Sequence, residues 1–322
     1  MKDLELMVTL CPTFPHYERF ARDSRIQGVR LNSAMVFGDE VDAEINAANA
    51  VSGARPLYFD IKGRQLRIME IHSNPNRLEF TLNHPIEVET PIPVLFKAGS
   101  DVALLTDVTE HGHRLIFDGG PKWKVKAGES ICIRHPSLKI SGPVYCDYEI
   151  RKIYKVIDSG FKRFFLSYVE EERDLSEFYD ILGFPPEEVI LKIESKKGLE
   201  YVANKWKKYD DVSLCAARGD MFVEIDKPHE ILAAQKLIAK KDPQALVGSR
   251  ILLSIVTNPV PECHDFSDLA WLYDIGYRRM MLCDELCLKE SLLGTAVNVF
   301  ESFRNVYGTD KKESVKRRRW FW

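Results

Sequence analysis

Short apolar runs recur along the whole chain, and more polar, amphipathic stretches separate them. Most of these runs are rich in Val, Ile, Leu or aromatic residues, and none is longer than nine residues. Apolar runs of this length predict strands that are buried on both faces, as in a parallel sheet. Eight of them stand out, at residues 7–12, 28–32, 56–61, 161–169, 188–194, 211–217, 250–256 and 278–284.

The stretches between these runs carry apolar residues at helical spacing. Their ends bear helix signals, with Gly53 as a C-cap and Pro228 in a first turn. The alternation of eight strands with helices predicts a (β/α)8 (TIM) barrel, in which active sites lie at the C-terminal ends of the strands. We predict helices within segments 42–53, 144–158, 174–184, 228–242 and 290–307.

One interval, residues 68–141, has a different texture. It contains short β-prone segments punctuated by Asn, Pro and Gly, which predict strands joined by turns. We therefore predict a small all-β lid domain, inserted into the barrel after its third strand. The barrel then comprises residues 1–67 and 142–308, and a basic and aromatic tail follows at 309–322. Removing the 74 residues of the insertion leaves 248, close to the ~250 of a typical barrel.

Composition and charge narrow the class of protein. Hydrophobic residues make up 45% and charged residues 29% of the 322 positions, which excludes a disordered or fibrous chain. A nucleic-acid-binding protein usually has an excess of positive charge, whereas the formal net charge of this chain is −3. We therefore expect no nucleic-acid partner. No apolar run is long enough to span a membrane, and the first residues do not read as a signal peptide. We expect a cytoplasmic protein with reduced cysteines.

Ionisable residues gather where the predicted strands end. Arg30 lies near the end of the second run, and Lys192 and Glu194 lie at the end of the fifth. Asp220 comes just after the sixth run. Two carboxylates on neighbouring strands suit Mg²⁺, which completes its shell with water and substrate oxygens. The basic residues, with Arg67, suit phosphate or carboxylate oxygens. Each residue alone could be a structural ion pair at the barrel mouth, but five strand ends supply such groups together.

Several segments resemble the pyruvate kinase family. ARGDMFVEI at 217–225 is similar to its metal-binding signature, and EVILKIES at 188–195 to its active-site strand. LYFDIKGRQLRI at 57–68 and GVRLNSA at 28–34 are similar to two further motifs, in the same order. The resemblance implies a phosphotransferase of glycolysis that acts on phosphoenolpyruvate or pyruvate with ADP or ATP. It also implies Mg²⁺ (or Mn²⁺) and K⁺ as cofactors.

The resemblance implies roles for individual residues. Lys192 and Arg30 would contact the transferring phosphoryl group, and Arg67 would contact nucleotide phosphate. Glu194 and Asp220 would hold the divalent metal. The remaining roles are substrate binding by Ala217, Arg218, Gly219, Asp220 and Ser254, a monovalent-cation site at Asn32, Asp60 and the Ile61 carbonyl, and a lid turn at Asp118.

The chain also departs from the family pattern. The family's histidine near the nucleotide is missing after Asn32, and its threonine near the substrate has Ser254 as the nearest counterpart. No segment matches the family's C-terminal regulatory domain, so we expect a minimal, unregulated member. Two alternatives stay open: Mg²⁺-dependent enolate chemistry on pyruvate or a related keto acid without nucleotide, of aldolase or decarboxylase type, and a non-catalytic binding protein derived from the family.

The tail is unusual in its own right. Four basic residues precede three aromatic ones in Lys316–Trp322. The tail is either a solvated terminus or a segment that docks on the barrel, on a second subunit of a homo-oligomer or on an anionic surface.

Overall fold

The computed structural model describes residues 4–33, 55–72, 77–258 and 260–307. The predicted helix at 42–53 and the tail at 309–322 lie outside the described residues.

Eight parallel strands of the described chain close into a barrel, which confirms the predicted fold class. Each strand pairs with its two neighbours, and β16 pairs with β1 to complete the ring. In order around the barrel, the strands are β1 (Glu5–Thr9), β2 (Gly28–Asn32), β3 (Leu57–Ile61), β12 (Arg163–Leu166), β13 (Glu188–Ile193), β14 (Val212–Ala217), β15 (Leu246–Gly248) and β16 (Arg279–Met281).

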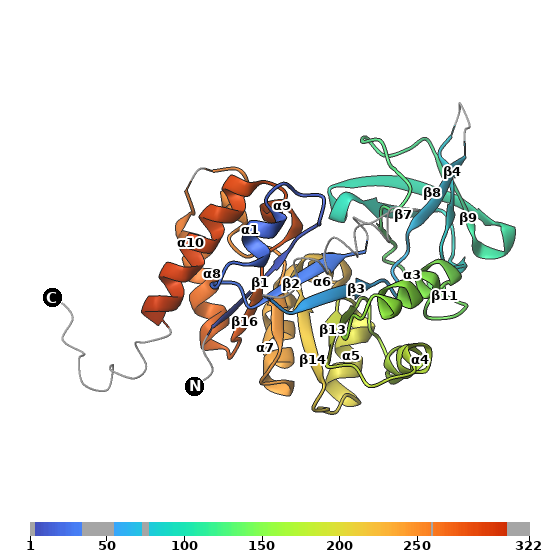
Figure 1. Ribbon diagram of the computed structural model, residues 1–322. Helices are drawn as coiled ribbons and strands as arrows, with labels where there is room; N and C mark the ends of the chain where they lie inside the picture. Colours follow the sequence, from blue (N-terminus) through green and yellow to red (C-terminus); the bar gives the residue numbers. More distant parts are fainter. Residues whose placement is uncertain (1–3, 34–54, 73–76, 259, 308–322) are drawn as a thin grey trace.

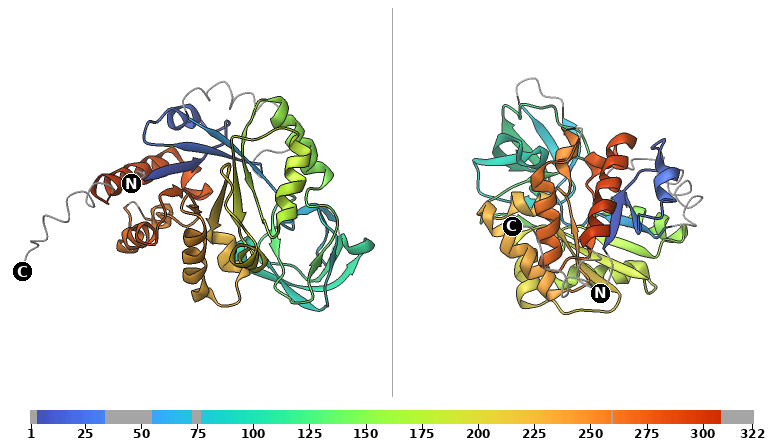
Figure 2. Two further views of the ribbon diagram at one scale, coloured as in Figure 1. Left: turned by 90° about the horizontal axis from the view of Figure 1, so that it is seen from below. Right: turned by 90° about the vertical axis from the view of Figure 1, so that its left-hand side faces the viewer.

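Helices surround the barrel on its outside (Figures 1 and 2). Their apolar faces and the outward-facing strand residues form the main hydrophobic core. Among the described residues, no helix combines the length and apolarity that crossing a membrane requires. The helices are α1 (Tyr17–Ala21), α3 (Asp147–Asp158), α4 (Glu172–Leu182), α5 (Lys196–Asn204), α6 (Arg218–Glu224), α7 (Ile231–Lys241), α8 (Cys263–Asp274), α9 (Asp284–Cys287) and α10 (Glu290–Tyr307).

The seventh strand is not where the apolar pattern placed it. The prediction of a strand over 250–256 is wrong, because β15 is Leu246–Gly248 and Leu253–Val256 form a 3₁₀ helix. Positive φ angles at Ser249, Arg250 and Leu252 turn the chain between the two elements. Of the apolar residues of the predicted strand, Ile251, Leu252 and Ile255 are buried in the main core outside the barrel strands, whereas Val256 is exposed.

An antiparallel sheet is inserted between β3 and β12, as predicted for a lid after the third strand (Figure 1). It has its own hydrophobic core, separate from that of the barrel. The exact domain limits, 68–141 for the lid and 1–67 with 142–308 for the barrel, stay predictions. In the described chain the sheet has the order β10 (Ile131–Cys132), β7 (Ile92–Phe96), β8 (Asp101–Thr109), β9 (Arg114–Asp118), β5 (Glu79–Leu82) and β4 (Ile68–His72), and β11 (Lys139–Ile140) pairs with β6 (Ile86–Glu87).

The barrel interior is arranged in layers, because alternate residues of each strand share a face. On β13, Glu188, Ile190 and Lys192 are spaced by two, and Ile190 belongs to the apolar middle layer. Gly28 lies in this layer, where a Cβ atom would approach the Met7 Cε to 2.8 Å. Two residues further along β1, β2, β3 and β13, the inward positions are the polar residues Thr9, Arg30, Asp60 and Lys192, whereas β14 and β15 carry Ala217 and Gly248 at this level. The alternation of inward and outward positions therefore places charged side chains at the C-terminal mouth of the barrel, next to the apolar middle layer.

Candidate active site

A buried carboxylate, Asp60 on β3, organises the mouth of the barrel. Arg30 Nη2 lies 2.6 Å from Asp60 Oδ2, and Lys62 Nζ lies 3.0 Å from Oδ1. Lys192 Nζ is 3.5 Å from Oδ2. Burial opposes ionisation of this group, but the three cations outweigh it and hold the pKa of Asp60 well below its ordinary value. Asp60 is therefore an anion that holds three cationic side chains in place.

The two lysines of this cluster differ in their proton affinity. Burial would lower the pKa of Lys192, but Asp60 and Glu194 together raise it above the ordinary value. Burial, assisted by the charges of Lys192 and Arg30, lowers the pKa of Lys62 to about 7 even though Asp60 opposes it. Lys192 thus stays an ammonium ion at neutral pH, whereas Lys62 titrates near neutrality.

The three cationic side chains around Asp60 line a cavity of about 370 Å³ between the barrel and the inserted sheet, which we call the mouth cavity. Five of its lining residues are basic, and they come from both parts of the molecule. Its lining consists of Arg30, Asn32, Lys62, Gln65, Arg67, Lys97, Glu129, Ser130, Lys192, Asp220 and Asp284. A basic cavity of this size suits a small substrate that carries several anionic oxygens.

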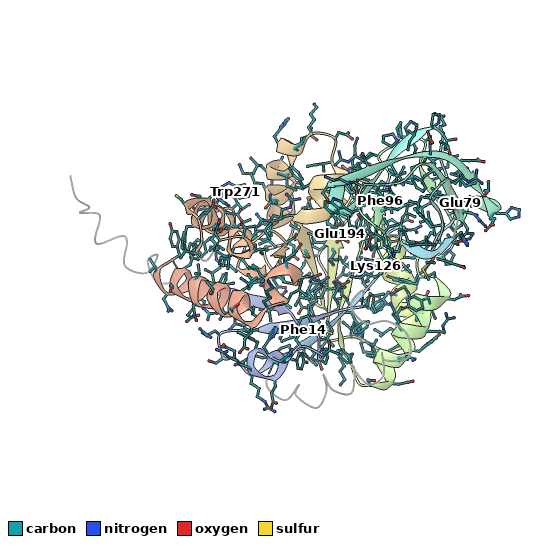
Figure 3. The ribbon with its side chains drawn as sticks, turned by 90° about the horizontal axis from the view of Figure 1, so that it is seen from above. Phe14, Glu79, Phe96, Lys126, Glu194 and Trp271 are labelled. Carbon is teal, nitrogen blue, oxygen red and sulfur yellow. The ribbon has the colours of Figure 1, made fainter. Side chains whose placement is uncertain are left out.

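Two carboxylates follow the fifth and sixth strands of the barrel. Glu194, near the centre of the molecule in Figure 3, accepts hydrogen bonds from Lys192 Nζ at 2.9 Å and from the Tyr168 amide at 2.7 Å. Burial, together with the charge of Asp220, raises the pKa of Glu194 to about 7 although the Lys192 ammonium opposes this. Asp220 lies half-buried in the first turn of α6 and lines the mouth cavity.

This donor set fits a divalent cation. The charge of Asp220 disfavours ionisation of Glu194, and a cation bound beside both carboxylates would relieve this repulsion. No group of three His, Cys, Asp or Glu side chains within the described ranges is arranged to hold a metal ion. Two carboxylates suffice for Mg²⁺, however, because it takes one or two of them and fills its shell with water and substrate oxygens.

The monovalent-cation set predicted at Asn32, Asp60 and Ile61 does not fit a metal ion as it is arranged. Both oxygens of Asp60 already accept from cationic side chains, and Oδ1 also accepts from the Ser167 hydroxyl at 2.8 Å. The Ile61 carbonyl accepts from the Ser167 amide at 3.0 Å. The Asn32 side-chain amide donates to Asp284. The Lys62 ammonium lies where a monovalent cation would meet Asp60.

The residues around the start of α6 take up different positions. Ala217 ends β14, and the helix begins at Arg218. The Arg218 guanidinium points to α8, where it makes a bidentate ion pair with Asp268 at 2.7 and 2.8 Å. Gly219 allows a close approach, because a Cβ atom there would lie 2.5 Å from the Ser249 hydroxyl. Arg218 therefore braces the helix start, and Ser249 is the hydroxyl that follows the seventh strand.

Ser254 and Asp118, like Arg218, are predicted site residues that do not line the mouth cavity. Ser254 lies in the 3₁₀ helix after β15, where its hydroxyl donates to Asp265 and accepts from the Glu262 amide. It belongs to the start of α8, since Asp265 also caps that helix. Asp118 is exposed at the end of β9 and does not line the cavity.

Several cavity residues received no role from the sequence, among them Lys62, Asp284 and Lys97. Lys62 and Asp284 were visible as polar residues at strand ends, but only the structure shows their partners. Asp284 Oδ1 lies 3.1 Å from Arg30 Nη1, and its Oδ2 accepts from the Asn32 amide at 2.8 Å. Lys97 comes from the inserted sheet, pairs with Glu129, and has no signal in the strand pattern.

Comparisons with known proteins point to one family. Residues 122–287 match the model of the pyruvate kinase barrel domain. The pyruvate kinase of Methanocaldococcus jannaschii is 26% identical over 302 residues, which cover 88% of this chain and 65% of that protein. The pyruvate kinase of Borreliella burgdorferi is 24% identical over 293 residues, covering 84% of this chain and 61% of the relative. Pyruvate kinase 1 of Saccharomyces cerevisiae is 27% identical over 157 residues, 45% of this chain and 31% of the relative. The chain thus spans less than two thirds of the length of these relatives.

Proposed function

This chain belongs to the pyruvate kinase family, and from that premise we propose that it transfers a phosphoryl group between phosphoenolpyruvate and ADP, with Mg²⁺ or Mn²⁺ as cofactor. One observation carries the proposal. The mouth cavity places the cations Arg30, Lys62, Arg67, Lys97 and Lys192 around one space, beside a pair of carboxylates that suits a divalent metal. Phosphoryl transfer depends mainly on such positioning and charge stabilisation.

The side chains of the chain divide the work. In the proposed reaction, the bond between the phosphorus and the enol oxygen breaks, and a bond to a terminal oxygen of ADP forms. Arg30, fixed by Asp60 and by the Thr9 hydroxyl at 3.0 Å, holds the phosphoryl oxygens. Lys192 stays protonated and stabilises the negative charge that develops on the enol oxygen. Arg67 holds the nucleotide phosphate.

The remaining proposed contacts hold the metal and the substrate carboxylate. Glu194 and Asp220 would bind the divalent ion. When bound, that ion neutralises charge on the phosphoryl and enolate oxygens. Backbone amides of Ala217–Asp220, where α6 begins, would bind the substrate carboxylate.

A coupled assay with phosphoenolpyruvate, ADP and Mg²⁺ tests the proposal. Lys192→Met should lower kcat by about 10³-fold, because the developing charge loses its buried ammonium partner. Lys196→Met is the matched control, since the Lys196 side chain is exposed and pairs with Asp226 on the surface. Absence of turnover above the Lys192→Met level in the unmodified chain would refute the proposed reaction, and ligand binding without turnover would instead identify a non-catalytic binding protein.

A second candidate function has one observation in its favour. The Asp284 carboxylate forms an ion pair with the Arg30 guanidinium, and this contact disfavours the binding of a phosphate to Arg30. The same lysine and carboxylates would then stabilise the enolate of pyruvate or a related keto acid without nucleotide. Exchange of pyruvate methyl protons with solvent, followed by NMR in the absence of ATP, distinguishes the two. Exchange that needs no nucleotide and exceeds any kinase turnover supports this second function.

A further inference from the structure

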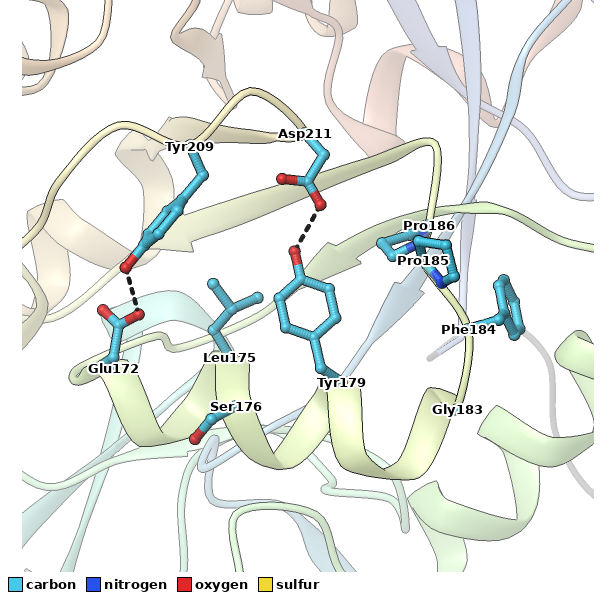
Figure 4. Close-up of a pocket in the computed structure, with 10 residues that line it drawn as sticks. All are labelled: Glu172, Leu175, Ser176, Tyr179, Gly183, Phe184, Pro185, Pro186, Tyr209 and Asp211. Atoms are coloured by element: carbon cyan, nitrogen blue, oxygen red, sulfur yellow. Dashed lines mark hydrogen bonds between the residues drawn. The ribbon is translucent and has the colours of Figure 1, made fainter.

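A groove of about 530 Å³ lies on the outside of the barrel, beside α4 and the loops that lead into β13 and β14 (Figure 4). These loops meet the N-terminal ends of the strands, whereas the mouth cavity lies at their C-terminal ends. The groove therefore takes no part in the proposed phosphoryl transfer. Its apolar walls are formed by Leu175, Tyr179, Phe184, Pro185, Pro186 and Tyr209.

The groove combines aromatic surface with negative charge. Among the described residues that line it, the charged ones are Glu172 and Asp211. The Tyr209 hydroxyl donates to Glu172 and the Tyr179 hydroxyl donates to Asp211, both at 2.8 Å, so that the two rings are held upright along the groove (Figure 4). Tyr209 is still 41% exposed. Aromatic and proline walls bind aromatic side chains and the faces of guanidinium groups, and carboxylates bind cations.

We propose that this groove binds the segment Lys316–Trp322 of a second copy of the chain. The segment offers four consecutive cations followed by three aromatic residues, which is the complement of acidic groups beside an aromatic wall. It also lies outside the described residues and has no role in the proposed reaction.

The topology favours a second copy over the same chain. The helix α4 follows β12 and precedes β13, whereas α10 follows β16 and reaches Leu4, just before β1, through Arg304. These two gaps are diametrically opposite in the ring of eight strands, and Figures 1 and 2 show the two helices on opposite sides. Residues 308–315 span at most about 30 Å when extended. Within one chain they would have to pass around half of the helix ring, whereas a second copy can approach the tail directly.

Sedimentation of full-length chains tests this contact. The unmodified chain should associate in a concentration-dependent way. Two groove variants, Tyr209→Ala and Glu172→Lys, and one tail variant with Trp320, Phe321 and Trp322 changed to Ala should each weaken association by about tenfold or more. Tyr154→Ala is the control, because Tyr154 is a similarly exposed tyrosine on α3 outside the groove.

Mixing the variants identifies the source of the tail. A groove variant keeps its tail and the tail variant keeps its groove, so the two should form a one-to-one complex with each other although neither associates well alone. A monomeric unmodified chain, association that survives both kinds of substitution, or failure of the mixture to associate would each overturn the proposal. Phosphotransfer assays on the same variants report on the mouth cavity alone, so that failure of the proposed reaction would leave this test unaffected.

Discussion

Asp284 is the residue that sets the mouth cavity apart from a simple anion site. It contacts Arg30 and Asn32 from the first turn of α9, and it lines the same cavity as the five basic residues. An incoming phosphate must share Arg30 with this carboxylate, and two anions on one guanidinium repel each other. Asp284 therefore lowers the affinity of the cavity for an anionic substrate.

Replacing this carboxylate should strengthen substrate binding. In Asp284→Asn, Arg30 keeps its ion pair with Asp60, so that its position is retained while the competing charge is lost. We expect the KM for phosphoenolpyruvate to fall by about fivefold. Steady-state kinetics measure this, with Glu285→Gln as a control because the neighbouring Glu285 is exposed and does not line the cavity. An unchanged or higher KM would show that Asp284 does not compete with substrate.

The ammonium group of Lys62 leads to a second prediction at this scale. It lies 3.0 Å from Asp60 in the position that a monovalent cation would need. At pH 6, below the pKa of about 7 for Lys62, we expect the rate in K⁺-free buffer to be within about twofold of the rate in KCl, because the protonated lysine already places a positive charge beside Asp60. In Lys62→Met, K⁺ should become stimulatory. The coupled assay at matched ionic strength measures both, and strong K⁺ activation of the unmodified chain would contradict the prediction.

At the scale of the strands, a second polar layer lies at the N-terminal ends of the barrel strands. Glu188 on β13 pairs with Arg279 on β16 at 2.6 Å and accepts from the Tyr58 hydroxyl at 2.7 Å. Burial would raise the pKa of Glu188, but the Arg279 guanidinium and these hydrogen bonds outweigh burial and lower it. The layer thus ties three strands together through one ionised carboxylate.

This polar layer makes the free energy of unfolding depend on pH. Because the pKa of Glu188 is lower in the folded chain than in the unfolded chain, its contribution is present above the ordinary value of 4.5 and is lost as the pH falls through the folded value. Glu188→Gln should lower the free energy of unfolding by about 3 kcal/mol at pH 7, because the buried Arg279 then keeps only the more exposed Glu5, at 3.3 Å, as an anionic partner. The difference from the unmodified chain should shrink towards pH 3. Urea unfolding measures it, and Glu200→Gln on the exposed face of α5 should show no such trend.

Strand β15 shows why apolar pattern alone fails to place every strand. Residues 250–256 are longer and more apolar than Leu246–Gly248, yet the shorter segment pairs with β14 and β16. Burial requires apolar residues both in a central strand and in a turn packed beneath helices, so the pattern does not separate the two. The strand ends at a turn in which Ser249, Arg250 and Leu252 have positive φ angles. The sequence gives no sign of this turn, because none of the three residues is Gly or Asn, the residues that most often adopt positive φ. Ser254 was misplaced for the same reason.

The sequence predicts those site residues whose positions follow from the alternation of inward and outward side chains along a strand. Arg30, Asp60 and Lys192 meet because each is an inward position near the end of a parallel strand, and the sequence locates such positions directly. Lys97 and Glu129 meet the same cavity only because the inserted sheet docks over the mouth. That docking depends on tertiary contacts, and the pattern of a single strand carries no information about it.

At the scale of the whole molecule, two separate hydrophobic cores share one cavity. The barrel and its helices enclose one core, and the inserted sheet encloses another in which the rings of Phe80, Phe96 and Phe117 contact each other. Lys97 lies directly after β7, the strand that carries Phe96. The stability of the smaller core therefore determines how firmly one wall of the mouth cavity is held.

This arrangement predicts that the sheet can be loosened while the barrel stays intact. Phe80→Ala removes a fully buried ring and should cost the sheet about 3–5 kcal/mol. Hydrogen exchange should then accelerate in the strands of the sheet and leave the barrel strands unchanged, because the two cores do not share side chains. The KM for ADP should rise with it, since Arg67 and Lys97 lie at the junction. Phe164→Ala, which removes an equally buried ring from the barrel core, should give the opposite exchange pattern. If Phe80→Ala accelerates exchange in barrel and sheet equally, the two cores unfold as one unit, which would contradict the prediction.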